Sequence, residues 1–185
     1  MKPIHPVPAL LLSLILHGIG PRLLSAEALA SASPPRKADL VIVGTGISGL
    51  AAALDAGRAG ANVTVIDMWS VFGGHAVMSG GLVCLVDTPF QWEQDVPDSP
   101  DLAIWDFLTH GEDANPDWVR LYARNSKREV YDWLEALRVG WSQLFTLIPG
   151  NSVQRQHVAK GRGIGLISPI YRECLSWPNI HFVWN

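Results

Sequence analysis

The hydrophobic positions between residues 40 and 67 form two apolar runs with a helical stretch between them. Leu40–Val43 and Val63–Ile66 are continuous runs rich in β-branched residues, typical of strands buried on both faces of a parallel sheet. Leu50–Leu54 consists of Leu and Ala, which are strong helix formers. Because parallel strands need a crossover connection, this order of strand, turn, helix and strand predicts a βαβ unit and an α/β fold.

Beyond residue 87 the apolar positions fall at helical spacing. Asp87–Pro100 is polar and rich in proline, so we predict a loop there. Ser99-Pro100 and Asn115-Pro116 each place a capping residue before a proline, which predicts two helix starts, and Gly111 predicts the end of the first helix. The apolar spacing continues to Gly140. We expect the aromatic residues of this helical excursion to face a core.

The last part of the chain contains a second glycine-rich turn. Phe145–Lys160 has no clear hydrophobic period. Gly161–Gly165 then precedes an expected helix, Ile167–Leu175, and an expected strand, Ile180–Trp184. A glycine-rich turn of the dinucleotide-binding kind follows an apolar strand. Since Asn151–Lys160 is polar, we predict no dinucleotide site at this second turn.

The turn after the first apolar run carries the pattern Gly44-x-Gly46-x-x-Gly49, and Asp67 ends the second run. Gly44 allows a sharp turn, Gly46 lets a pyrophosphate approach the backbone, and Gly49 lets the helix lie close to the sheet. The phosphates would lie at the helix N-terminus, and Asp67 would accept hydrogen bonds from an adenosine ribose. The pattern predicts a dinucleotide site. A glycine-rich turn without a ligand is the alternative.

A second glycine-rich segment follows Asp67 and favours FAD over a nicotinamide dinucleotide. FAD is longer, and bare backbone N–H groups near glycines can line its pyrophosphate and ribityl chain. The apolar flanks of the segment argue against a mobile surface loop. The predicted cofactor-binding residues are Gly44, Thr45, Gly46, Ile47, Ser48, Gly49, Asp67, Met68, Gly73, Gly74, His75, Ala76, Ser79, Gly80 and Gly81.

Composition excludes several classes of function. The chain has 185 residues, a formal net charge of -3 and 48% hydrophobic residues, which fits one domain with a core and no nucleic-acid-binding surface. Cys84 and Cys174 have no metal-ligand neighbours in the sequence, and no His/Cys group has zinc spacing. We therefore predict two unpaired buried thiols and no metal site.

The N-terminal segment predicts export. Lys2 precedes the apolar stretch Ala9–Ile19, which is too short to span a bilayer, and Ala28-Leu29-Ala30 forms a small-residue cleavage site. The expected organisation is a signal peptide at 1–30, a linker at 31–37 and a cofactor domain at 38–185. The expected location is periplasmic or extracellular, with no stable membrane span after cleavage. A retained N-terminal anchor, a buried hydrophobic helix and a cytoplasmic protein are the alternatives.

These motifs resemble the FAD-binding domain of the fumarate reductase and succinate dehydrogenase flavoprotein superfamily, which includes flavocytochrome c fumarate reductases and 3-ketosteroid dehydrogenases. The similarity covers about residues 38–185 and rests on the Gly44–Gly49 turn, Asp67, Gly73-Gly74 and Ser79-Gly80-Gly81. It implies a Rossmann-like FAD-binding βαβ domain with a helical excursion. It also implies a truncated chain, because the family's substrate-capping domain and catalytic residues lie beyond Asn185, so no catalytic residue is assigned.

The chain departs from the family at three positions. Asp67 replaces the usual Glu, and His75 and Ala76 follow Gly73-Gly74 where the family commonly has Ser, Thr or Asn. In the succinate dehydrogenase branch a loop His bonds covalently to the flavin, but His75 is one position out of that register. A non-covalent cofactor contact and a plain loop histidine are the alternatives. His157 resembles a family His near the cofactor, and a surface or capping position is its expected place.

The resemblance implies hydride transfer between FAD and a carbon adjacent to a carbonyl or carboxylate, with a small-molecule substrate and an electron-donor protein as partners. An amine-oxidase-type flavoenzyme, a nicotinamide dehydrogenase and a non-catalytic nucleotide-binding remnant are the alternatives. In the amine oxidase class an Arg usually follows the Gly-Gly pair, where this chain has His75. Bound-cofactor absorbance separates flavin from nicotinamide.

Overall fold

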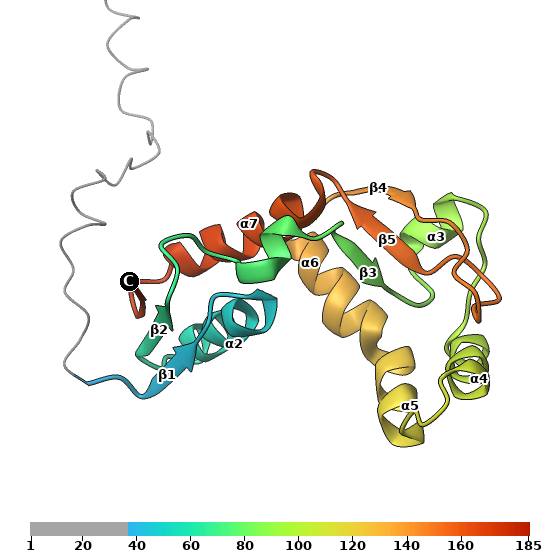
Figure 1. Cartoon of the computed structure of the whole chain (residues 1–185), viewed down its shortest axis with the longest axis horizontal. Helices are drawn as coiled ribbons and strands as arrows, with labels where there is room; N and C mark the ends of the chain where they lie inside the picture. Colours follow the sequence, from blue (N-terminus) through green and yellow to red (C-terminus); the bar gives the residue numbers. More distant parts are fainter. Residues whose placement is uncertain (1–36) are drawn as a thin grey trace, which may run out of the picture. The chain divides into compact units, whose positions relative to one another are not determined.

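The computed structural model describes residues 37–185, and Figure 1 shows their arrangement. In chain order the elements are β1 (Leu40–Val43), α2 (Ile47–Arg58), β2 (Val63–Asp67), the 3-10 helix η1 (Gly74–Met78), β3 (Leu82–Cys84), α3 (Pro89–Glu93), α4 (Pro100–His110), α5 (Pro116–Asn125), the π-helix η2 (Ser126–Tyr131), α6 (Asp132–Ala136), β4 (Trp141–Leu144), β5 (Gln156–Ala159), α7 (Arg162–Leu175) and β6 (Ile180–Trp184).

The first sheet has the strand order β1-β2-β6, and its strands are parallel. Leu40 pairs with Val63, and Val63 pairs with Ile180, so three segments far apart in the sequence share one register. Helix α2 connects β1 to β2 and packs against both strands. The predicted α/β fold with its βαβ unit is therefore confirmed.

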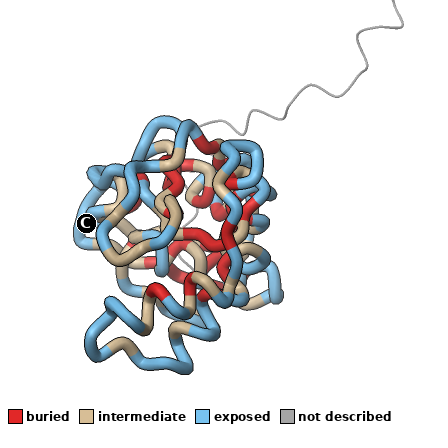
Figure 2. The backbone as a smooth tube through the Cα atoms, turned by 90° about the vertical axis from the view of Figure 1, so that its right-hand side faces the viewer, coloured by how far each residue is buried: buried red, intermediate tan, exposed pale blue. Residues whose placement is uncertain are grey.

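The core lies between this sheet and helices α2 and α7. Leu50, Leu54, Val63 and Val65 are fully buried, and Ile170 of α7 packs in the same cluster. Figure 2 shows the buried residues gathered inside the molecule, with exposed loops around them. Leu, Ile and Val on facing elements bury apolar area from water here, which is the main favourable term in folding.

The second sheet was not predicted. It has the order β3-β5-β4, and its strand pairs are antiparallel. The stretch before Gly161, for which no apolar strand was expected, contains β5, whose residues His157, Val158 and Ala159 are buried. That this turn is no dinucleotide site stays a prediction. Both ring nitrogens of His157 in β5 form buried hydrogen bonds, so a polar residue faces the interior and a hydrophobicity pattern does not reveal the strand. The thiols of Cys84 and Cys174 are unpaired, but only Cys174 is buried as predicted, whereas Cys84 is partly exposed.

The predicted loop Asp87–Pro100 contains a short helix, α3, that the sequence analysis missed. Thr88 and Gln91 form a reciprocal capping box at its start, with Thr88 Oγ1 accepting from Gln91 N at 3.1 Å. Thr88 N in turn donates to Gln91 Oε1 at 3.0 Å. The two side chains therefore accept from backbone N–H groups that have no acceptor within the helix. This capping stabilises a five-residue helix next to prolines.

The helical excursion has the predicted starts, with Ser99 and Asn115 capping α4 and α5. The expectation that its aromatic residues face a core was wrong for Trp105 and Trp118, which are 58% and 69% exposed. Helices α5, η2 and α6 run on without a break, and the wider π turn brings Ser126 under the end of β3. Ser126 Oγ accepts there from Val86 N at 3.2 Å, a bond that ties the start of the π segment to the chain after β3.

Arg155 joins the excursion to the second sheet through a buried ionic cluster. Its guanidinium donates to both oxygens of Asp98 at 2.8 Å and to Asp106 Oδ2 at 2.5 Å. These three side chains are at most 1% exposed. Burial alone would raise the pKa of Asp106, but hydrogen bonds from Ser152 and Arg155 outweigh it and lower that pKa. The cluster joins α4 and the residues just before it to the residue that precedes β5.

His157 lies in the core, so the expected surface position was wrong. Its side chain is fully buried, Nδ1 lies 2.8 Å from Arg155 O, and Nε2 lies 2.7 Å from Thr88 Oγ1. A carbonyl oxygen only accepts, so Nδ1 carries the proton and Nε2 accepts from the Thr88 hydroxyl. Burial lowers the pKa of His157.

This histidine predicts a pH dependence of stability. Its folded-state pKa lies below the ordinary value of about 6.5, so the unfolded chain binds more protons as the pH falls through that value. The free energy of unfolding should therefore decrease below pH about 6.5, by at most about 1.4 kcal/mol per pH unit. Urea titrations of wild type and His157→Asn between about pH 7 and 5 check this. The slope of the unfolding free energy against pH should flatten in His157→Asn and persist in His110→Asn, an exposed-residue control. Equal slopes in all three proteins would contradict this role of His157.

Within residues 37–185, no helix combines the length and apolar character needed to cross a membrane. The same part of the chain holds no group of three or more His, Cys, Asp or Glu side chains arranged for a metal ion. The predicted signal peptide and most of the predicted linker lie outside the described residues.

Candidate functional site

The first glycine turn leaves β1 and enters α2. Gly44 has φ +99°, a conformation that other residues rarely adopt, and a Cβ on Gly49 would lie 2.1 Å from Gly44 O. A Cβ on Gly46 would meet no atom within 4 Å. Gly44 and Gly49 thus serve the turn and its packing, whereas Gly46 borders open space.

Backbone donors face that space. The first intrahelical hydrogen bond of α2 runs from Leu50 N to Gly46 O, so Ile47, Ser48 and Gly49 begin the helix with N–H groups that have no intrahelical acceptor. A helix N-terminus also carries a partial positive charge, and the first turn of α2 contains no acidic residue. An open glycine beside such a terminus fits a diphosphate.

Asp67 ends β2 next to this turn, and its carboxylate is held by three donors. Oδ2 accepts from Thr45 N at 2.7 Å and from Thr45 Oγ1 at 2.5 Å, and Oδ1 accepts from Trp69 N at 3.0 Å. The Thr45 hydroxyl and the Trp69 N–H lower the pKa of Asp67, so the side chain is an anion at neutral pH. A partly exposed anionic carboxylate at this position suits a ribose hydroxyl.

Thr45 occupies a different place from the other residues of the turn. Its side chain is fully buried, and its hydroxyl also accepts from Gly73 N at 3.1 Å. The side chain therefore points into the protein and links the first glycine turn, Asp67 and the second glycine segment. A direct contact between this hydroxyl and a cofactor does not fit the geometry.

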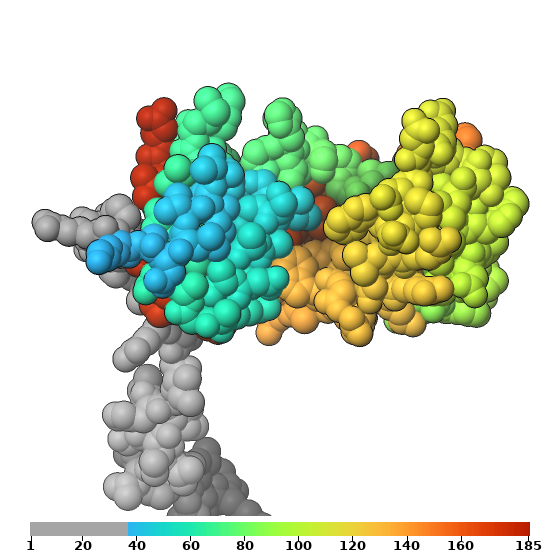
Figure 3. Space-filling view, turned by 90° about the horizontal axis from the view of Figure 1, so that it is seen from below, coloured from blue at the N-terminus to red at the C-terminus, as the bar shows by residue number. Residues whose placement is uncertain are grey.

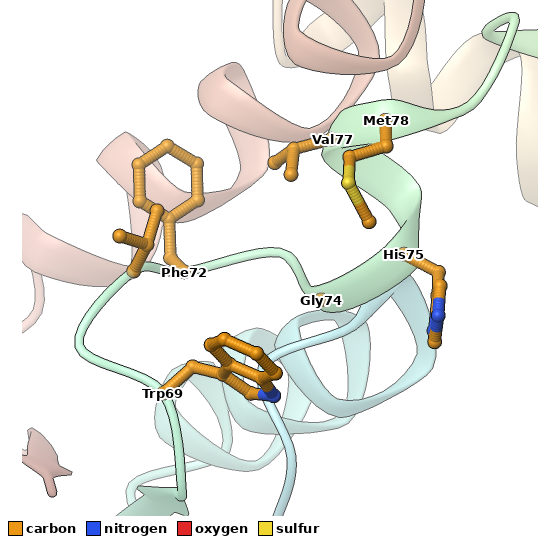
Figure 4. A pocket seen from close by; sticks show the side chains of 7 residues that line it. Trp69, Phe72, Gly74, His75, Val77 and Met78 are labelled. Atoms are coloured by element: carbon orange, nitrogen blue, oxygen red, sulfur yellow. The ribbon is translucent and has the colours of Figure 1, made fainter.

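The second glycine segment borders an apolar pocket, shown in Figure 4. Gly73 and Gly74 both have positive φ, and a Cβ on Gly74 would meet nothing within 4 Å. The pocket has a volume of about 260 Å³, and its lining residues are Trp69, Val71, Phe72, Gly74, His75, Val77 and Met78. His75 is exposed on η1, Met68 is 75% exposed, and Ala76 is half-buried. The pocket has room for only a part of a dinucleotide.

The sequence analysis did not include five of the pocket residues, Trp69, Val71, Phe72, Val77 and Met78. The sequence did contain a signal for these residues. Several apolar side chains soon after a ribose-binding acid are unusual for a solvated loop and indicate a ligand-facing surface. Trp69, Val71 and Met78 are 66%, 63% and 76% exposed, so they offer an apolar surface to a ligand rather than to the core.

Ser79-Gly80-Gly81 lies against the start of α7. Gly163 N donates to Ser79 O at 3.1 Å, and a Cβ on Gly163 would lie 2.2 Å from Ala76 O. A Cβ on Gly81 would likewise lie 2.3 Å from the backbone of Arg162. Gly163 of the Gly161–Gly165 turn and Gly81 therefore allow these two backbone segments to pack directly against each other. This contact fixes the position of Ser79-Gly80-Gly81.

A hollow lies beside the start of α2. Ile47, Ser48 and Ala51 form one wall, and Val130 and Trp133 lie opposite. Figure 3 shows the hollow between the blue-to-teal residues of α2 and the yellow-to-orange residues of η2 and α6. Ile47 and Ser48 are exposed, so both border this hollow and the helix N-terminus.

The sequence matches the model of a family described as FAD binding domain over residues 39–180. The chain is 35% identical over 140 residues to a fumarate reductase (cytochrome) of Shewanella frigidimarina, covering 75% of this chain and 24% of that protein. It is 32% identical over 162 residues to a KsdD-like steroid dehydrogenase of Mycolicibacterium smegmatis, covering 78% of this chain and 30% of that protein.

A solved structure shows the same architecture. The open conformation of a flavocytochrome c3 fumarate reductase superposes with a TM-score of 0.73 and 27% identity, covering 86% of this chain and 28% of that chain. The present chain thus spans between about a quarter and a third of the length of these relatives. The open glycines, the anchored Asp67 and the apolar pocket all fit FAD, and the chain belongs to the FAD binding domain family.

Proposed function

We propose that the Gly44–Gly49 turn, Asp67 and the second glycine segment bind FAD together. The pyrophosphate would lie against Gly46 and the free N–H groups of Ile47 and Ser48, and Asp67 would accept from the adenosine ribose. The open space at Gly46 beside the α2 N-terminus carries this proposal. Gly74, His75, Met68 and Ala76 would border the cofactor from η1 and the preceding loop, and Ser79-Gly80-Gly81 would line its flavin half.

We further propose that the complete protein is an oxidoreductase acting on a carbon adjacent to a carbonyl or carboxylate. Bound FAD would supply the hydride-accepting or hydride-donating flavin. The two relatives named above, a fumarate reductase and a KsdD-like steroid dehydrogenase, support this substrate class. Residues 39–180 would bind and orient the cofactor, and polypeptide outside them would contact the substrate.

The proposal includes the partners and the location. A small molecule would be the substrate, and an electron-carrier protein would exchange electrons with the flavin, in line with the words "cytochrome" and "flavocytochrome" in the names of two relatives. The apolar segment Ala9–Ile19 and the Ala28-Leu29-Ala30 site support export. Protease protection in cell fractions tests the location.

Asp67→Asn is expected to weaken FAD binding by roughly tenfold to a hundredfold. The carboxylate serves three donors at once, and an amide has only one oxygen to accept, so its NH₂ group would meet a backbone or hydroxyl donor. Loss of a hydrogen bond to a charged group costs about 1.5–3 kcal/mol. Quenching of flavin fluorescence on titration of FAD with purified protein measures the change in Kd.

Asp113→Asn is the matched control, because Asp113 is an exposed aspartate between α4 and α5 and does not line the hollow beside α2. It should bind FAD as wild type does. Wild-type protein that stays colourless after incubation with FAD and gel filtration would overturn the proposed function. Bound FAD that no donor reduces would instead indicate a non-catalytic nucleotide-binding protein.

A further inference from the structure

We propose that Thr45 is the positioning residue of the cofactor site: its hydroxyl and N–H fix Asp67 so that only Oδ1 can accept from a ribose, and tie Asp67 to the second glycine segment. This inference rests on the proposed function, because it concerns how the same site recognises FAD. Thr45 itself is fully buried and acts through Asp67 and Gly73.

The hydrogen-bond donors around Asp67 determine which carboxylate oxygen can still accept from a ligand. A carboxylate oxygen has two acceptor positions. Oδ2 uses both on Thr45, through the amide at 2.7 Å and the hydroxyl at 2.5 Å. Oδ1 uses one on Trp69 N at 3.0 Å and keeps one. A ribose hydroxyl can therefore bond only at Oδ1, and Thr45 sets the rotation of the carboxylate that presents it.

The direction of the hydroxyl proton is also set. Gly73 N donates to Thr45 Oγ1 at 3.1 Å, so the oxygen is an acceptor on that side. The Thr45 hydroxyl then donates to Asp67 Oδ2, since a carboxylate without a proton only accepts. The result is a one-way chain from Gly73 N–H through Thr45 O–H to Asp67. It couples the position of the loop around Gly73 to the charge on Asp67.

In the part of the chain that the structure describes, no cationic side chain helps to hold the Asp67 carboxylate. Among residues 37–185, no Lys, Arg or His nitrogen lies within 4.0 Å of the Asp67 carboxylate. Three neutral donors from Thr45 and Trp69 hold the anion, and the side-chain donor is Thr45. Removing the hydroxyl should leave the carboxylate with two backbone donors only, hold its orientation less firmly and raise its affinity for a proton.

The test compares Thr45→Val with Thr45→Ser in FAD titrations from about pH 7.5 to 4.5. Valine keeps the shape of threonine without its hydroxyl, and it should weaken FAD binding about tenfold to a hundredfold at neutral pH. Its loss of affinity on acidification should also begin at a higher pH than in wild type, because the pKa of Asp67 rises. Serine keeps the hydroxyl and should restore the wild-type pH profile. Thr64→Val, a buried threonine of β2 outside the site, is the matched control and should behave as wild type.

A second measurement needs no variant. Carbon NMR titration of Asp67 in the wild-type protein without FAD should give a pKa below the ordinary Asp value. A pKa at or above that value would overturn the proposal, even if Thr45→Val fails to fold. Unchanged FAD affinity and pH profile in Thr45→Val would also overturn it. Wild-type protein that does not bind FAD would contradict the proposed function, while NMR titration of wild type and Thr45→Val would still decide whether the Thr45 hydroxyl holds Asp67.

Discussion

Gly46→Val is expected to abolish FAD binding and leave the protein folded. A Cβ at this position meets no protein atom within 4 Å, and Gly46 has φ -63° and ψ 175°, a conformation open to valine. The side chain would instead occupy the space where the pyrophosphate approaches the α2 N-terminus. Overpacking and lost hydrogen bonds to a charged group each cost about 1–3 kcal/mol, so the affinity should fall by about a hundredfold or more.

The measurement pairs fluorescence titration with FAD and thermal unfolding of the cofactor-free protein. Ala52→Val introduces a valine at an exposed position of α2 and should leave FAD binding unchanged. Gly49→Val should behave in the opposite way and lose stability itself, because its Cβ would lie 2.1 Å from Gly44 O. A Gly46→Val protein that retains its flavin would contradict the proposed place of the pyrophosphate.

Arg155→Met should destabilise the fold by roughly 3–5 kcal/mol, because it leaves the buried carboxylates of Asp98 and Asp106 without their cation. Methionine fills much of the same volume, so lost packing contributes little to this cost. Urea unfolding at neutral pH measures it, and the thermal midpoint should drop by roughly 10 °C.

Arg58→Met is the matched control. Arg58 pairs with Glu173 at 3.1 Å, but both side chains are 36% exposed, so its loss should cost less than about 1 kcal/mol. Equal destabilisation by the two substitutions would mean that the buried cluster is no more important than a surface ion pair. An Arg155→Met protein within about 1 kcal/mol of wild type would contradict the role given to the cluster.

Local patterns were sufficient for the strands of the first sheet and the helix starts, but the burial expected on both faces of Leu40–Val43 was wrong, since Val41 and Val43 are 56% and 81% exposed. Leu40–Val43 and Val63–Ile66 are apolar whether or not their neighbours are known, and a proline after Ser99 or Asn115 marks a helix start by its own geometry. The same patterns failed for β5 and α3. Arg155 and His157 look like surface residues until partners from Asp98 and Thr88, both far away in the sequence, bury them.

The sequence by itself determined the βαβ unit, the glycine turn and the acid that together mark an FAD-binding domain, because close backbone approach requires glycine at fixed spacing. Only the tertiary structure decided the role of Thr45, since a hydroxyl in a turn has no direction until Asp67 and Gly73 are placed around it. It likewise showed that Gly163 and Gly81 serve contacts between backbones. Hydrogen bonds and close contacts between residues far apart in the chain depend on the folded geometry, and no local pattern contains them.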